Sequence, residues 1–347
     1  CSAVGLLVFL ILFQQALVNG LVGDFIGAVR NSDNPVLVFN EQARANVEGS
    51  FLLPDQAAAV AGVEGVAESG PIGQNTFTAR TATEDEALDA VLFGYELGGL
   101  GAPTTLVEGR LPAGDLEGVA SAADADLGFD LGDTVTIVGE ETDVEIVVVG
   151  RAESVRWSVA PTVFVSYPTF EAAVRAVNPD ATTVLPSLMS VRPAPGVDLG
   201  TLTDRIDAEI DGVEALTNAE AVDQNPGVAG VRQSFNVIIA LAFIVVVIVV
   251  AFFFMILTVQ KADSLTLLRA IGAPRRYLVV NLLAQIALVM AVGSVVGLLA
   301  TVAAVDLAPS GDLSVTLEAS TILPTLVGIS VLSGLGGIGA VRRAVSY

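Results

Sequence analysis

Carboxylates are the only plentiful side chains in this sequence that could act in acid–base or metal chemistry. The chain has 38 Asp and Glu residues, no histidine and one cysteine, Cys1. Without histidine it cannot build a Ser-His or Cys-His nucleophile pair or a His-ligated metal site. A lone cysteine also excludes an intrachain disulfide. The remaining candidates are grouped acids: Glu84, Asp85 and Glu86; Asp124 and Asp126; Glu140, Glu141, Asp143 and Glu145.

These acids lack the spacing of a known site. The segment DLGFDLGDTVTI (126–137) resembles a calcium-binding loop in its first acids, but Ile137 stands where the loop needs Glu. The sequence has no P-loop and no Gly-x-Ser-x-Gly, and its one G-x-G-x-x-G (residues 334–339) lies inside the apolar segment 320–341, which lacks the strand-to-helix context of a dinucleotide-binding site. We therefore expect the acids to form a solvated surface. We expect no catalytic residue, no metal and no cofactor on this chain.

A basic decapeptide, LLRAIGAPRR (267–276), stands out because the whole chain carries a formal net charge of −22. The stretch KADSLTLLRAIGA before it favours a short amphipathic helix that ends near Gly272 and Pro274. Its apolar positions recur at helical spacing: Leu265, Leu268 and Ile271. Two interpretations follow from the residues alone. The helix is a basic anchor on anionic lipid, or it docks onto a cytoplasmic partner.

Four uncharged apolar segments are each about as long as a bilayer crossing, roughly 20 residues. They are 1–23, 234–259, 277–305 and 320–341. Gln14 and Gln15 are polar for lipid, so we expect them to face another helix. Small residues four apart allow close helix packing, with incidental glycine as the alternative for any one pair: Gly293 with Gly297, Ser330 with Gly334, and Ser333 with Gly337.

Charge distribution predicts the topology of these segments. Residues 24–232 hold 34 acids and 10 bases, whereas the rest of the chain holds 4 acids and 6 bases. Those six bases all lie in the loop 260–276 and the tail 342–347. Short loops rich in Lys and Arg stay cytoplasmic, so we expect that loop and tail inside. The acidic loop 306–319 and the region 24–232 are then outside a multi-pass cell-membrane protein.

The region 24–232 has the pattern of a mixed α/β domain with its own core. We expect a helix beginning at Pro54, a hairpin of strands 133–139 and 143–150, and a strand that leads into a helix at Pro168. A strand, a helix and a further strand follow over residues 187–217. The predicted fold class is thus an α-helical membrane protein with four transmembrane helices and a large α+β extracytoplasmic domain between helices 1 and 2.

Two features bear on the source and start of the chain. Lys261 is the only lysine, and an acidic, lysine-poor surface indicates a halophilic source. Cys1 followed by Ser2 could be the lipidated start of a lipoprotein. We favour the alternative that the sequence begins inside a longer protein, because an apolar run follows at once and no initiator Met is present.

The segment LTLLRAIGAPRRYLVVNLLAQIALVMAVGSVVGLL (265–299) resembles the signature region of the FtsX/MacB-type ABC transporter permeases. The outer region agrees with their periplasmic core domain in its successive segments: VEGRLPAGD, LGFDLGDTVTI, VEIVVVGRAESV and TVFVSYPTFEAAV. One helix, a large outer domain and three further helices also match the family's layout. One departure is the absence of Glu shortly before LRAIGA, where this chain has Asp263, Ser264 and Thr266.

The resemblance implies a permease without catalytic residues that works as a homodimer or paired permease. ATP and Mg²⁺ would bind a separate ABC ATPase subunit, and the loop 260–276 would be the coupling helix that docks onto it. The implied docking residues are Leu265, Leu268, Arg269, Ile271, Gly272, Arg275 and Arg276. Motion would pass along helix 2 to the outer domain (mechanotransmission), for export or extraction of a lipophilic or peptide substrate.

Two further functions stay open. An FtsX-like regulator would transmit force to an extracytoplasmic enzyme without transport. A freestanding membrane anchor would bind a partner protein through its acidic domain. Membrane lipids are expected partners of each, and nucleic acid is not.

Overall fold

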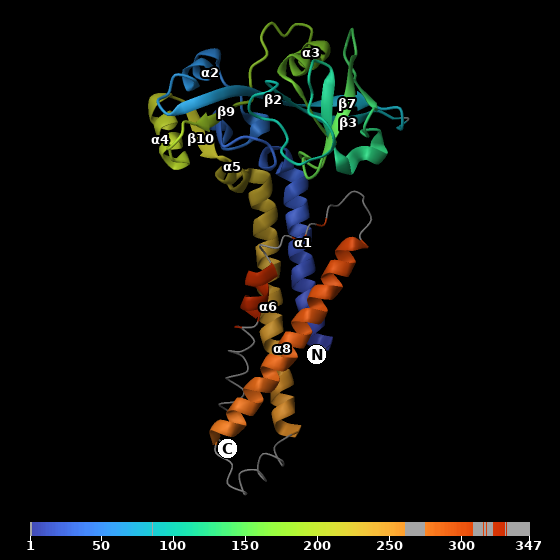
Figure 1. Cartoon of the computed structure of the whole chain (residues 1–347), viewed down its shortest axis with the longest axis vertical. Coiled ribbons are helices and arrows are strands. Elements are labelled where there is room, and N and C mark those ends of the chain that lie inside the picture. The colour runs from blue at the N-terminus through green and yellow to red at the C-terminus, as the bar shows by residue number, and fades with distance from the viewer. Residues whose placement is uncertain are drawn as a thin grey trace. The chain divides into compact units, whose positions relative to one another are not determined.

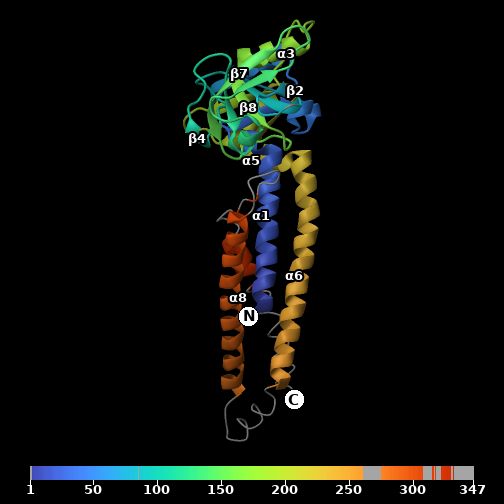
Figure 2. The same cartoon turned by 90° about the vertical axis from the view of Figure 1, so that its right-hand side faces the viewer.

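The computed structural model describes residues 2–84, 86–260, 275–307, 315, 317, 322–329 and 331. The chain divides into two compact units (Figures 1 and 2). The sheet unit is Leu21–Val231, and the helical unit combines Cys1–Gly20 with Arg232–Tyr347. Two helices, α1 (Ser2–Arg30) and α6 (Pro226–Gln260), contribute residues to both units.

The helical unit is built from long apolar helices, because a backbone in lipid must satisfy its own hydrogen bonds. Besides parts of α1 and α6 it contains α8 (Arg275–Asp306), and residues 322–329 are also helical. Among the described residues, three helices are long and apolar enough to cross a membrane: Val4–Arg30, Pro226–Val249 and Ala287–Val305. Most of the expected fourth segment, 320–341, lies outside the described residues.

The helices of this unit share one apolar core. Side chains of α1, α6, α8 and the segment 322–329 meet in it: Val4, Val8, Ile11, Leu12, Val246, Met290 and Ile329. The expectation that the first helix covers 1–23 differs from its observed length, since α1 continues to Arg30. Asp24 therefore lies within a helix, and it is buried.

The described part of the sheet unit contains one mixed sheet of ten strands. Their order is β10-β1-β9-β2-β3-β8-β5-β7-β4, and β6 pairs with β2 and β7. The β3–β8 and β5–β7 pairs are parallel, and the other pairs are antiparallel. The strands are β1 (Val36–Asn40), β2 (Val66–Arg80), β3 (Leu88–Tyr95), β4 (Leu106–Gly109), β5 (Glu117–Ser121), β6 (Thr134–Ile137), β7 (Val144–Ala152), β8 (Thr162–Ser166), β9 (Leu188–Pro193) and β10 (Val213–Thr217).

The 15-residue strand β2 belongs to two lobes (Figure 1). Its first part pairs with β9 as far as Ile72, and its second part pairs with β3 from Gly73 onward. We call β10, β1, β9 and the first part of β2 the β1 lobe, and the other strands the β3 lobe. Gly70 and Pro71 lie just before the change of partner. Glycine and proline weaken a strand interior and favour a bend.

The β1 lobe has its own apolar core beneath short helices. The helices α2 (Pro54–Val60) and α4 (Leu199–Glu209) contribute side chains to this core, and the lobe also contains α5 (Asn218–Gln224) and the 3-10 turns η1 (Glu41–Ala43) and η2 (Val47–Gly49). As predicted, α2 begins at Pro54, and the Gln56 side chain accepts a hydrogen bond from the Leu53 N–H. Leu202 and Ile206 of α4 pack into the core with Val36, Val38 and Val191 of the strands.

The β3 lobe packs α3 (Tyr167–Val177) against its strands, and η3 (Ala122–Leu127) follows β5. The cross-strand partners Gly73 and Gly94 leave a slot that Phe170 of α3 fills, because a Cβ at either glycine would overlap its side chain. The predicted hairpin is confirmed, since β6 and β7 are antiparallel. The strand-to-helix segment at Pro168 is confirmed as β8 and α3.

Candidate functional site

Most of the predicted coupling helix lies outside the described residues. This part includes Leu265, Leu268, Arg269, Ile271 and Gly272. Arg275 and Arg276 are the first two residues of α8, the helix that contains the membrane-length segment Ala287–Val305. The docking role of all seven residues stays a prediction.

Gly293 and Gly297 lie where α8 packs against α1. A Cβ at Gly293 would lie 2.6 Å from Cγ1 of Val4, and one at Gly297 would lie 2.7 Å from the backbone oxygen of Gly5 and 2.7 Å from Cβ of Val8. Only glycine allows this approach, as expected for small residues that bring membrane helices together. The other predicted packing residues, Ser330, Ser333, Gly334 and Gly337, lie outside the described residues.

A polar contact also joins two segments of the helical unit. Thr325 donates a hydrogen bond from Oγ1 to Oε1 of Gln15 over 2.7 Å. This agrees with the expectation that Gln15 faces another helix. Burial of such a group in an apolar environment is unfavourable unless it is hydrogen-bonded.

The grouped acids behave as expected with one exception. Glu84, Glu86, Asp126, Glu140, Glu141, Asp143 and Glu145 are exposed, and Asp85 lies outside the described residues. The expectation of a solvated side chain is wrong for Asp124, which is fully buried. Within the described ranges, no group of three or more His, Cys, Asp or Glu is arranged to hold a metal ion.

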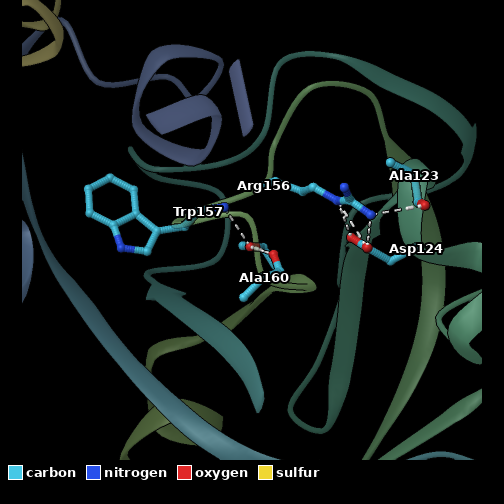
Figure 3. A network of polar contacts seen from close by, with 6 residues as sticks. Ala123, Asp124, Arg156, Trp157 and Ala160 are labelled. Atoms are coloured by element: carbon cyan, nitrogen blue, oxygen red, sulfur yellow. Dashed lines mark hydrogen bonds and ion pairs between the residues drawn. The ribbon is translucent and has the colours of Figure 1, made fainter. Parts of the chain in front are cut away.

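Asp124 is buried because Arg156 neutralises it. The Arg156 Nε donates to both carboxylate oxygens, at 2.9 and 3.1 Å, and Nη2 donates to Oδ1 as well. Nη2 also donates to the carbonyl oxygen of Ala123 over 3.3 Å (Figure 3). Burial raises the pKa of the Asp124 carboxyl above its ordinary value, and the hydrogen bonds and charge of Arg156 oppose that rise.

Trp157 extends away from Arg156 along the same loop (Figure 3). The residue is 3% exposed, and its indole ring packs edge-on against Phe93, with ring centroids 5.6 Å apart. The indole Nε1 donates to Oε1 of Glu48 over 2.9 Å, and the backbone N–H donates to Oγ1 of Thr162. The loop 153–160 is therefore fixed on one side by an ion pair and on the other by a buried aromatic ring.

The VEGRLPAGD segment is organised by a second ion pair. Arg110 donates from Nη1 and Nη2 to the two carboxylate oxygens of Glu117, at 2.7 and 2.6 Å. The Ala113 N–H donates to Oε2 of Glu117 over 2.8 Å. The hydrogen bonds from Arg110, and next those from the backbone, lower the pKa of Glu117 to about 2. The pair closes the turn that leads into β5.

Sequence reasoning missed the Asp124–Arg156 pair because its members are 32 residues apart and no motif joins them. The sequence did contain one signal. Only 10 bases accompany 34 acids in residues 24–232, so each arginine there has many potential partners. That ratio predicts ion pairs in general, but it does not say which acid is buried.

Comparison with known proteins bears on the helical unit. Residues 236–347 match the FtsX-like permease C-terminal family. The matched part begins within α6 and includes α8 and the basic loop between them. No protein with a curated description matches the chain.

Two solved domains are similar to the sheet unit. The extracellular domain of the noncanonic ABC-type transporter YknZ from Gram-positive bacteria is 15% identical, with a TM-score of 0.36, over 52% of this chain and 99% of that one. The periplasmic region of MacB from Actinobacillus actinomycetemcomitans is 13% identical, with a TM-score of 0.38, over 55% of this chain and 92% of that one. Neither likeness identifies an activity of this chain.

Proposed function

We propose that this chain is the permease subunit of an ABC transporter. It couples ATP hydrolysis on a separate ATPase subunit to movement of its sheet unit, for export or extraction of a lipophilic or peptide substrate. The observation that carries the proposal is the match of residues 236–347 to the FtsX-like permease family. The three apolar helices of membrane length support it.

The proposed docking element is the loop 260–276 with the start of α8. Leu265, Leu268 and Ile271 would fill an apolar groove of the ATPase, and Arg269, Arg275 and Arg276 would meet its acidic residues or lipid phosphates. Two of these arginines begin α8, which contains a membrane-length segment, and this supports a position at the membrane surface. The proposed assembly is two permease chains with two ATPase chains.

The proposed topology follows the charge distribution. The sheet unit lies outside the cell, and the loop 260–276 and the tail lie in the cytoplasm. The 34 acids of residues 24–232 and the basic character of the loop and tail support this orientation.

A second candidate function is force transmission to an extracytoplasmic enzyme without transport. The four apolar segments 1–23, 234–259, 277–305 and 320–341 contain no Asp, Glu, Lys, Arg or His. Ionisable residues within membrane segments usually mark substrate or ion pathways. The absence of such residues from these segments favours a protein that transmits motion over one that conducts a polar solute.

Co-purification tests the first step of both functions. The permease carrying Arg269→Asp with Ile271→Asp should lose an ATP-hydrolysing chain that the wild-type protein retains. A matched control is Arg175→Asp with Val177→Asp, which changes the same residue classes at the same spacing on the exposed side of α3. If the Arg269→Asp with Ile271→Asp variant retained as much of the ATPase chain as the control variant, the docking proposal would be wrong. ATP-dependent efflux from vesicles would then exclude the purely regulatory function.

A further inference from the structure

The end of α1 is held by the loop 153–160, which lies between β7 and β8. Within the sheet unit, residues 24–28 of α1 and this loop are joined through their backbones (Ile26 and Trp157 form an antiparallel bridge). Three hydrogen bonds do this: Ala28 N–H to the Arg156 oxygen (3.1 Å), Ser158 N–H to the Phe25 oxygen (3.0 Å) and Val159 N–H to the Asp24 oxygen (2.9 Å). The loop is thus in an extended conformation and is hydrogen-bonded to the backbone of the helix end.

Gly27 permits this close approach. A Cβ at Gly27 would overlap the backbone oxygen of Ser154 and lie 3.2 Å from that of Arg156. One turn earlier, Gly23 has nothing within 4 Å of the equivalent position. Glycine is disfavoured inside a helix unless another backbone must come near. The two glycines therefore provide a matched pair, one in the contact and one beside it.

The other lobe holds the same end of α1. Asn218, the first residue of α5 in the β1 lobe, donates from Nδ2 to the Val29 oxygen over 2.9 Å. Asn31, just beyond the helix, donates from Nδ2 to the Ser154 oxygen over 2.6 Å in the β3 lobe. Trp157 connects the loop directly to η2 of the β1 lobe through its hydrogen bond to Glu48.

The loop is also anchored in its own lobe. The backbone oxygen of Arg156 accepts a hydrogen bond from the Ala28 N–H of α1, and its guanidinium donates hydrogen bonds to Asp124 in η3. Because this ion pair is fully buried, the loop backbone cannot shift away from η3 without exposing or separating two charges. Arg156 is accordingly a positioning residue, which fixes the backbone that contacts Gly27 and Ala28.

We infer that the loop 153–160 and Asn218 form a clasp, which fixes the end of α1 to both lobes at once. The lobes share strand β2, whose partner changes at Ile72 and Gly73 beside Gly70 and Pro71. A displacement of α1 therefore changes the angle between the lobes about this part of β2. The inference rests on the proposed function in one respect only, namely that ATP hydrolysis on the partner subunit displaces α1.

Trp157 reports the clasp, because it is the only tryptophan of the chain. Full-length protein in detergent should be compared as wild type, Gly27→Ala and Gly23→Ala, without nucleotide or ATPase. We expect Gly27→Ala to shift the Trp157 emission to the red and to increase its quenching by acrylamide several-fold. Gly23→Ala should match the wild type. Identical quenching in the two variants would overturn the clasp.

Spin labels test whether the clasp sets the lobe angle. On a Cys1→Ser background, exposed Glu209→Cys in the β1 lobe and Glu141→Cys in the β3 lobe carry the labels. Gly27→Ala should broaden the distance distribution between them, and Gly23→Ala should not.

Asn218→Ala, which introduces no clash, should also broaden the distance distribution, with exposed Asn75→Ala as its control. Unchanged distances in both Gly27→Ala and Asn218→Ala would overturn the link between clasp and lobes. Because no nucleotide is present, these outcomes are independent of ATPase docking.

Discussion

Asp124 and Arg156 form a fully buried ion pair in which the arginine Nε donates to both carboxylate oxygens. Loss of one partner leaves an uncompensated buried charge, which typically costs about 3–5 kcal/mol. We therefore expect Asp124→Asn to lower the free energy of unfolding of the sheet unit by an amount of that order. Urea unfolding followed by Trp157 fluorescence measures it.

A surface pair provides the control for this prediction. Glu171 and Arg175 form an i,i+4 pair on α3, with Arg175 about half exposed. Glu171→Gln should cost only about 0.3–0.5 kcal/mol. Equal losses from Asp124→Asn and Glu171→Gln would show that burial of the first pair has no energetic consequence.

Glu117 should make the sheet unit sensitive to acid. Its pKa in the folded chain is about 2, below its ordinary value of 4.5, because Arg110 and backbone N–H groups bind the carboxylate. A lowered folded-state pKa stabilises the fold above the unfolded-state pKa, and this contribution is lost as the pH falls from about 4.5 towards 2. Glu117→Gln should flatten the pH dependence of the urea midpoint in this range. An unchanged slope would contradict the prediction.

Gly297 should be intolerant of even one added carbon. A Cβ there would lie 2.7 Å from the Gly5 oxygen, so Gly297→Ala must push α1 and α8 apart. Overpacking of this kind costs typically about 1–3 kcal/mol. Thermal unfolding in detergent should show a lower midpoint. Gly328→Ala is the control, because its Cβ would lie 3.9 Å from Phe243; similar midpoints for both variants would argue against tight packing at Gly297.

The proposed topology predicts which cysteines a membrane-impermeant maleimide reaches. On a Cys1→Ser background, Glu141→Cys in the sheet unit should be labelled in intact cells. Ser264→Cys in the basic loop should be labelled only after the cells are opened. Labelling of Ser264→Cys in intact cells would reverse the orientation that the charge distribution indicates.

Salt should stabilise the sheet unit. Residues 24–232 carry 34 acids and 10 bases, so repulsion between carboxylates opposes the compact state. Raising the ionic strength from about 0.1 M to about 1 M shortens the Debye length from about 10 Å to about 3 Å. We expect the urea midpoint to rise over this range, with sucrose of matched osmolality as a control. A falling midpoint would contradict dominant self-repulsion.

Local sequence patterns were sufficient to predict several elements of the sheet unit. Pro54 marks the first residue of α2, and turn residues between two β-rich runs mark the β6–β7 hairpin. Leu202 and Ile206, four residues apart, lie on the buried face of α4. In each case the signal and the structure lie within a few residues of each other.

Features that depend on distant residues were not predicted. Strand β2 serves both lobes only because β9 and β3 approach it from different parts of the chain. Asp124 has the sequence surroundings of a surface acid, and its burial depends on Arg156, 32 residues away. The first helix continues beyond Asp24, whose side chain is buried in the sheet unit. The length of the apolar run does not predict this burial.

The pairing of β1 with β10 dictates the order in which the sheet unit can fold. Val36 pairs with Thr217, so the β1 lobe cannot close until nearly the whole unit has been synthesised. The β3 lobe needs only residues from Gly73 to Val177, which are contiguous. Contacts between distant residues form late and slowly. During synthesis, the apolar strand β1 therefore stays without its strand partners while the β3 lobe forms. The nascent chain is most prone to aggregate during this interval, because the strand is exposed.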